Sequence, residues 1–105
     1  MHLTSFLENG HLTIVLTGEI DHHCAKKNID EITGKLEAYR PEVCVLDFRE
    51  VTFMDSSGIA VVINTMRTVK KMNGKLMLSG LSEQPLKVFR ASGVDRLVQI
   101  KEGVL

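Results

Sequence analysis

The most chemically suggestive part of this chain is a turn that combines an acid with two hydroxyls. It reads Phe53-Met54-Asp55-Ser56-Ser57-Gly58. The apolar residues before the turn predict a strand, and the apolar-periodic residues after it predict a helix. The hydroxyls therefore stand at a helix start, where a hydroxyl could cap the helix, attack a substrate or accept a phosphate. The function depends largely on which of these three roles applies.

Helix capping is the simplest role, because serine and aspartate side chains satisfy the free N–H groups of a first turn. One cap needs one side chain, whereas this turn offers Asp55, Ser56 and Ser57 together. A phosphate here would meet the positive end of the helix dipole and add roughly −1.5 to −2 charge beside Asp55. The helix would tolerate that change, and its effect would fall on a molecule that docks against the turn.

A nucleophilic serine is less well supported. The hydrolase elbow Gly-x-Ser-x-Gly needs a first glycine that this turn lacks. His22 and His23 could lie near the same turn, but a chain of 105 residues offers little material for a substrate pocket. We therefore expect no catalytic residue and no enzymatic activity.

The run Asp21-His22-His23-Cys24 contains residue types that bind metals. Adjacent residues rarely converge on one ion, and no second group of ligands follows downstream. We expect Asp21 to cap the next helix and the two histidines to be solvated. The chain also lacks the Gly-x-x-x-x-Gly-Lys loop that holds nucleotide phosphates. The sequence thus predicts no metal and no cofactor.

The periodicity of apolar residues predicts strands and helices in the order β-β-α-β-α-β-α-β. Alternation on either side of Asn9-Gly10 predicts an opening hairpin at the edge of a sheet. A nearly continuous apolar run over 43–48 predicts a central strand covered on both faces. The predicted strands are 3–7, 11–17, 43–48, 75–79 and 97–100, and the predicted helices are 24–39, 57–72 and 82–91.

The helix predicted over 57–72 carries apolar residues on more than one side. The stripe that we expect to be buried consists of Ile59, Val62, Ile63, Met66 and Val69. The side that we expect to be exposed includes Ala60, Val61, Asn64 and Thr65. Ala60 and Val61 are small and apolar beside the serine turn, so they could form part of a patch for docking a protein.

The alternation of strands and helices implies right-handed parallel crossovers and an α/β fold with a mostly parallel sheet. The loops 18–22, 52–58 and 80–82 would then leave the carboxyl ends of successive strands, where such sheets place their functional crevice. The side chains that we expect to share this rim are Asp21, Asp55, Ser56 and Ser57.

Length and charge limit the remaining possibilities. With 105 residues the chain predicts one domain, 1–105, and thirteen basic residues balance thirteen acidic ones. A neutral domain lacks the basic face that nucleic acid needs, and no apolar run is long enough to span a membrane. No signal peptide is apparent, and Cys24 and Cys44 lack metal-ligand spacing, so we expect reduced thiols and a cytoplasmic protein.

Three segments together resemble the STAS domain, and more narrowly the bacterial anti-sigma factor antagonists of the sporulation and stress type. They are Leu16-Thr17-Gly18-Glu19-Ile20-Asp21-His22-His23, Val45-Leu46-Asp47-Phe48 and Phe53-Met54-Asp55-Ser56-Ser57-Gly58. The resemblance runs from about Leu12 to Ile100. It implies a single STAS-type domain with about five strands, an N-terminal hairpin edge and three or so helices.

The resemblance to this family implies that the protein switches between partners under the control of phosphorylation. The unphosphorylated antagonist binds an anti-sigma factor that is also a serine/threonine kinase of the histidine-kinase-like ATPase type, which frees a sigma factor. The kinase phosphorylates the serine after the aspartate, here Ser56, and a PP2C-type phosphatase restores the protein. Asp21, Asp55, Ser57 and Gly58 match the rim that the kinase contacts. The alternatives are a STAS module that binds a nucleotide or other small ligand, and a structural STAS subunit of a larger signalling assembly.

Overall fold

The opening hairpin is present in a computed structural model of the chain, which describes residues 2–101. Strand β1 (His2–Glu8) pairs antiparallel with β2 (His11–Ile20). The two turn residues between them have positive φ, 53° at Asn9 and 80° at Gly10, as a tight two-residue turn requires. The hairpin forms one edge of the sheet, as the sequence predicts.

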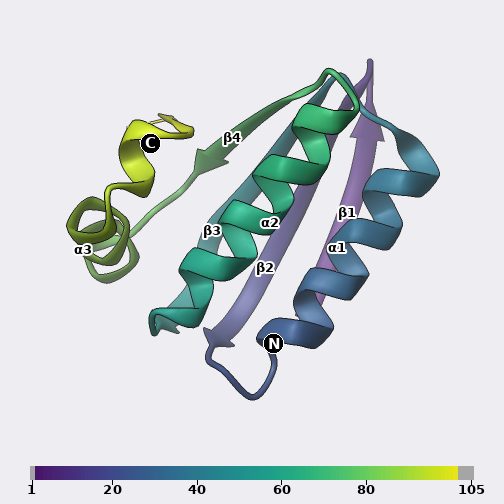
Figure 1. Cartoon of the computed structure of the whole chain (residues 1–105). Helices are drawn as coiled ribbons and strands as arrows, with labels where there is room; N and C mark the ends of the chain where they lie inside the picture. Colours follow the sequence, from purple (N-terminus) through teal and green to yellow (C-terminus); the bar gives the residue numbers. More distant parts are fainter. Residues whose placement is uncertain (1, 102–105) are drawn as a thin grey trace.

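The remaining strands are parallel to β2 and follow it in sequence order. They are β3 (Val43–Met54), β4 (Lys75–Ser79) and β5 (Gln99–Lys101), and the sheet order is β1-β2-β3-β4-β5. The connecting helices are α1 (Ala25–Tyr39), α2 (Ser57–Lys71) and α3 (Glu83–Ser92). Figure 1 shows α1 and α2 side by side across one face of the sheet. The α/β class and the mostly parallel five-stranded sheet are therefore confirmed.

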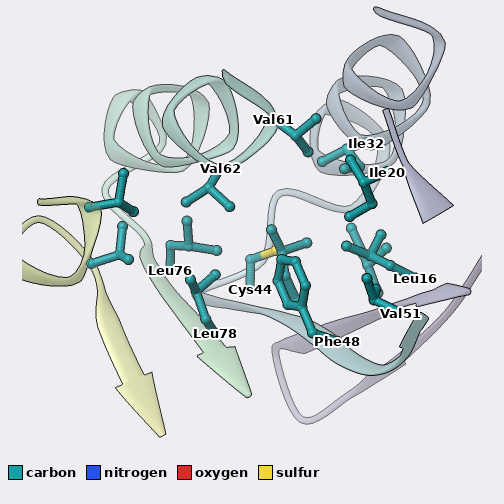
Figure 2. Close-up of a cluster of buried hydrophobic side chains, with 14 of the residues drawn as sticks. Leu16, Ile20, Ile32, Cys44, Phe48, Val51, Val61, Val62, Leu76 and Leu78 are labelled. Carbon is teal, nitrogen blue, oxygen red and sulfur yellow. The ribbon is translucent and has the colours of Figure 1, made fainter. Parts of the chain in front are cut away.

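The core lies between this face of the sheet and the helices. Alternate residues of the strands point into it, and Figure 2 shows Cys44, Leu78 and Leu16 from three strands below Val61 and Val62 of α2. Phe89 of α3 adds an edge-on contact with Phe48, with ring centroids 5.6 Å apart. Each such apolar side chain that is fully buried contributes about 1.5–3 kcal/mol relative to an exposed one.

The strand β3 is central, but the prediction that both its faces are covered is wrong. Cys44 and Leu46 are completely buried, whereas Val43 and Val45, on the opposite face, are only partly buried. Figure 2 shows Cys44 on the face beneath the helices, and Figure 1 shows no helix of residues 2–101 over the other face. An apolar run can thus belong to a strand that is fully covered on one face alone.

The strands β2 and β3 also extend further than the sequence predicts. Residues 18–20 and 52–54 were expected in loops, yet Gly18 pairs with Val51 and Ile20 with Met54. The pairing register shifts twice on the way, and Gly18 has φ of 102°, so the strands continue through irregularities that glycine permits. The last strand differs in the opposite sense, because a 3-10 turn (Val94–Arg96) precedes it and β5 begins only at Gln99.

The buried side of α2 is rotated relative to the prediction. Val61 and Thr65 were expected to be exposed, but they are 0% and 1% exposed. The Thr65 hydroxyl donates to the Val61 carbonyl at 2.8 Å, so its burial leaves the hydroxyl paired. The residues of the expected stripe that are only partly buried are Ile59, Ile63 and Met66. Both sides of α2 are apolar, and packing selects the side with the smaller residues against the sheet.

Candidate functional site

The last paired residues of β2 and β3 define the rim on which the candidate site stands. Ile20 pairs with Met54, and the N–H of Asp55 donates to the carbonyl oxygen of Ile20 at 3.0 Å. Asp21 and Asp55 follow these two partners directly, so they lie at the same end of the sheet although far apart in the sequence. The starts of α1 and α2 lie at this end as well (Figure 1).

The serine turn is capped by its aspartate and not by its serines. The carboxylate Oδ1 of Asp55 accepts the N–H of Ser57 at 2.7 Å, and the backbone carbonyl of Asp55 accepts the N–H of Gly58 at 3.1 Å. Ser56 is the N-cap residue of α2, with φ of −63° and ψ of −14°, and its side chain makes no cap hydrogen bond. Ser56 is exposed, whereas Ser57 is partly buried. The capping role open to Ser56 is therefore filled by its neighbour.

The environment of Ser56 suits a group that carries negative charge. It stands at the N-terminus of α2, where the positive end of the helix dipole favours an anion. Asp55 already supplies one carboxylate there, and α2 has no acidic residue in its own first turn. The exposed hydroxyl could therefore accept a phosphate without loss of a hydrogen bond that the described fold uses.

The loop after β2 presents a second carboxylate. Oδ1 of Asp21 accepts the N–H of His23 at 3.0 Å and that of Cys24 at 3.2 Å, and its carbonyl accepts the N–H of Ala25 at 3.0 Å. Asp21 thus supports the start of α1, as predicted, from a position before the N-cap residue Cys24. The Cys24 thiol, together with the backbone N–H groups of Cys24 and His23 and the charge of His23, lowers the pKa of Asp21. Asp21 is therefore a fixed negative charge on the rim.

The two histidines stack on each other at the surface. The rings of His22 and His23 have centroids 4.0 Å apart with an interplanar angle of 36°. Within residues 2–101 there is no cluster of three or more His, Cys, Asp or Glu side chains that could hold a metal. No hydrogen bond between these residues and Ser56 is present in that part of the chain, so the structure does not form a serine–histidine pair.

A groove between α1 and α2 begins beside Ser56. It has a volume of about 470 Å³. Its lining is Ile29, Ser56, Ile59, Ala60, Ile63, Asn64 and Arg67. The isoleucines of α2 were expected in the core, so sequence reasoning missed this surface. The signal that could have revealed this surface was the number of apolar residues on α2. It is too large for a single buried stripe, so some of them must be exposed.

Gln84 is a second residue that sequence reasoning missed. Its side-chain amide donates from Nε2 to the carbonyl of Met54 at 2.7 Å, and its Oε1 accepts the N–H of Met54 at 2.9 Å. The chain's third predicted loop, 80–82, leads into this residue, so the start of α3 reaches the same rim by a side chain. Nothing in the sequence around Gln84 signals this contact.

Comparison with known proteins identifies the family of this fold. The sequence model described as the STAS domain matches residues 7–104. The chain belongs to the STAS domain family. The family that the three segments predict is thereby confirmed, and no helix in residues 2–101 of this STAS domain has the length and apolar character needed to cross a membrane.

Several relatives of this STAS domain have a name that states a role. It is 30% identical over 97 residues to the anti-sigma-B factor antagonist of Listeria monocytogenes, across 90% of this chain and 82% of that protein. It is 30% identical over 83 residues to the anti-sigma F factor antagonist of Lysinibacillus sphaericus, across 79% and 71%. A solved structure of the Bacillus cell fate determinant SpoIIAA in its phosphorylated form is 26% identical with a TM-score of 0.72, over 95% of this chain and 91% of that one.

Proposed function

We propose that this STAS domain is a cytoplasmic anti-sigma factor antagonist, without enzymatic activity of its own, that is switched by phosphorylation of Ser56. Its unphosphorylated form binds an anti-sigma factor with serine kinase activity, and a sigma factor is released as a result. The observation that carries the proposal is that Asp55 caps α2, which leaves the exposed Ser56 hydroxyl available on the rim. The names of the relatives support the same role.

The chemistry of the switch requires only an accessible hydroxyl from this protein, because the kinase supplies ATP and the base. The oxygen of Ser56 forms a bond to the γ-phosphorus of ATP held by the kinase, the bond from that phosphorus to the β-phosphate oxygen breaks, and ADP leaves. The hydroxyl proton passes to a base on the kinase. A PP2C-type phosphatase reverses the switch when water attacks the phosphoserine and inorganic phosphate departs.

The charge of the rim explains why the phosphate would end the complex. Asp21 and Asp55 already make this end of the sheet acidic, so a partner must meet carboxylates there with donors or cations. A phosphate on Ser56 adds roughly −1.5 to −2 charge that the interface would have to desolvate. The fold itself has little to lose, because the phosphate stands at a helix N-terminus.

The groove beside Ser56 supplies apolar surface for the same partner. Ile59 and Ile63 are only partly buried and face it from α2, while Ile29 faces it from α1. An apolar patch next to a polar, charged rim is the usual anatomy of a protein interface. A kinase that covers both would place its active site over Ser56, and it would lose contact with both when the interface cannot desolvate the added phosphate charge.

The test is to incubate the protein with its cognate anti-sigma kinase and ATP, and to map the modified residue by mass spectrometry. We expect one phosphate on Ser56 in the wild type and in Ser57→Ala, and none in Ser56→Ala. Ser57→Ala is the matched control, because it removes the neighbouring hydroxyl of the same turn. Equal modification of Ser56→Ala would overturn the site, and binding of a small ligand with no response to the kinase would favour a ligand-binding module.

A further inference from the structure

The central strand runs well past the strand beside it. The last pair between β3 and β4 joins Asp47 to Ser79, yet β3 continues to Met54. Over this extension β2 still pairs with one edge of β3. On the other edge β4 has already ended, and no other strand in residues 2–101 takes its place. Backbone groups at such an edge need other partners, either water or side chains.

Gln84 takes the place of the missing strand at the last residue of the extension. Its amide accepts the N–H of Met54 at 2.9 Å and donates to the carbonyl of Met54 at 2.7 Å. A side-chain amide carries a donor and an acceptor like those of the peptide backbone, so it provides both hydrogen bonds that a neighbouring strand would provide. Gln84 belongs to the first turn of α3 and is partly buried.

The chain is held on the opposite edge one residue later. The N–H of Asp55 points toward β2 and donates to the carbonyl of Ile20 at 3.0 Å. Successive residues of a strand direct their backbone groups to opposite edges, so Met54 and Asp55 are fixed from the two sides in turn. These are the two residues that directly precede Ser56.

The side chain of Met54 provides a third anchor. It is completely buried, and it lies so close to the backbone of Gly58 that a Cβ on Gly58 would overlap Sδ and Cγ of Met54. The turn that presents Ser56 is thus held at Met54, before it, and at Gly58, after it. The two hydrogen bonds of Gln84 connect the first turn of α3 to this arrangement.

We propose that Gln84 is a positioning residue for Ser56: through both hydrogen bonds to Met54 it holds the turn at the height and angle that a kinase needs. The inference deepens the proposed switch and rests on it. It also makes α3 part of the switch, because a movement of the first turn of α3 would shift the residue from which the Ser56 turn departs. Gln84 touches no reacting atom and acts only through Met54.

The first measurement needs no kinase. Gln84→Met keeps the length and bulk of the side chain and removes its donor and acceptor, and Gln99→Met makes the same change on the exposed face of β5. Loss of two hydrogen bonds should make amide hydrogen exchange at Met54 roughly tenfold faster or more. Exchange in the part of β3 that pairs with β4, residues 43–47, should stay unchanged. Gln99→Met should exchange as the wild type does. Unchanged protection of the Met54 amide in Gln84→Met would show that the two hydrogen bonds from Gln84, which we call the Gln84 clamp, do not hold Met54.

The second measurement uses the kinase and separates binding from transfer. The docking surfaces remain in Gln84→Met, so we expect KM within about twofold of the wild type and kcat lower by about tenfold, since small misplacements of a reacting group carry costs of this size or larger. Loosened exchange with unchanged kcat would overturn the positioning role. Absence of any phosphate on Ser56 in the wild type would instead contradict the proposed function. Amide hydrogen exchange at Met54 would still test the Gln84 clamp in that case.

A second variant keeps one of the two bonds. Gln84→Glu can still accept the N–H of Met54, but its ionised second oxygen faces the carbonyl of Met54. Exchange at Met54 and kcat should both fall between those of the wild type and Gln84→Met, and both should move toward the wild type as the acid is protonated. Equal defects in the two variants at every pH would contradict the two-bond arrangement.

Discussion

The carboxylate of Asp55 accepts the N–H of Ser57 at 2.7 Å, and this hydrogen bond separates the residue that caps α2 from the serine that we propose is phosphorylated. Asp55 caps α2, and Ser56, which lies between the two partners, keeps an exposed hydroxyl with no cap bond. A chain that used Ser56 as its cap would weaken its own helix each time the serine was modified. Capping by Asp55 and the proposed phosphorylation of Ser56 thus fall on neighbouring side chains.

This division predicts a contrast in stability. Asp55→Ala should lower the free energy of unfolding by about 1 kcal/mol, because the N–H of Ser57 loses its acceptor. Ser56→Ala should change it by less than about 0.5 kcal/mol, as expected for a surface change that removes no contact. Urea unfolding followed by circular dichroism measures both. An equal loss in the two variants would show that Ser56 shares the cap.

Two helical glycines predict opposite effects of the same substitution. At Gly34 of α1 a Cβ would meet nothing within 4 Å, so Gly34→Ala should stabilise the protein by up to about 1 kcal/mol through helix propensity. At Gly58 of α2 the new Cβ would overlap the buried Met54 side chain, and overpacking of this kind costs about 1–3 kcal/mol. Thermal unfolding of both variants decides the matter. Stabilisation by Gly58→Ala would mean that Met54 moves freely.

The rotation of α2 predicts different roles for two of its aliphatic residues. Val61→Ala should lower the free energy of unfolding by about 1–2 kcal/mol, because Val61 is completely buried. Ile63→Ala should have a smaller effect on stability, because Ile63 is only partly buried, but it should weaken binding of the kinase at the groove. Urea unfolding and isothermal titration calorimetry provide the two readouts. A larger stability loss at Ile63 than at Val61 would restore the stripe that the sequence predicts.

Burial of Cys44 predicts a decline in stability at alkaline pH. Burial raises the pKa of this thiol from its ordinary 9.0 to about 12. In that window the unfolded chain loses the thiol proton while the folded chain keeps it, so the contribution is complete below pH 9 and falls by at most about 1.4 kcal/mol per pH unit as pH rises toward 12.

Comparison with Cys44→Ala isolates this contribution, because other groups titrate equally in both proteins. Urea unfolding between pH 8 and pH 11 should show a shallower decline in the variant. A thiol reagent should also modify the partly exposed Cys24 of the native protein long before Cys44. Parallel declines in the two proteins, or rapid modification of Cys44, would contradict the burial of this thiol.

Much of the architecture was predictable from local signals. Asn9-Gly10 encodes the hairpin, because both residues adopt positive φ, and Gly93 ends α3 with φ of 84°. The strand–helix alternation then fixes parallel crossovers, so the carboxyl ends of β2 and β3, and with them Asp21 and Asp55, reach one rim. The rim needed only topology, which is why residues distant in sequence could be placed together.

Features that depend on tertiary packing were not predictable in this way. The extension of β3 to Met54 relies on pairing with β2 through irregular register, and the buried side of α2 is chosen between two apolar sides by the surface it meets. The contact of Gln84 with Met54 joins residues 30 apart through side-chain amide geometry that no spacing reveals. Local periodicity cannot decide among alternatives that only the neighbouring element distinguishes.

The central claim is tested most directly by the affinity of the anti-sigma kinase for the two forms of the protein. We expect the purified phosphorylated form to bind at least about a hundredfold more weakly than the unphosphorylated form, with the two melting temperatures alike, because the charge acts on the interface and the helix N-terminus tolerates it. Equal affinity for both forms, or a phosphorylated protein that has lost its fold, would contradict the switch at Ser56.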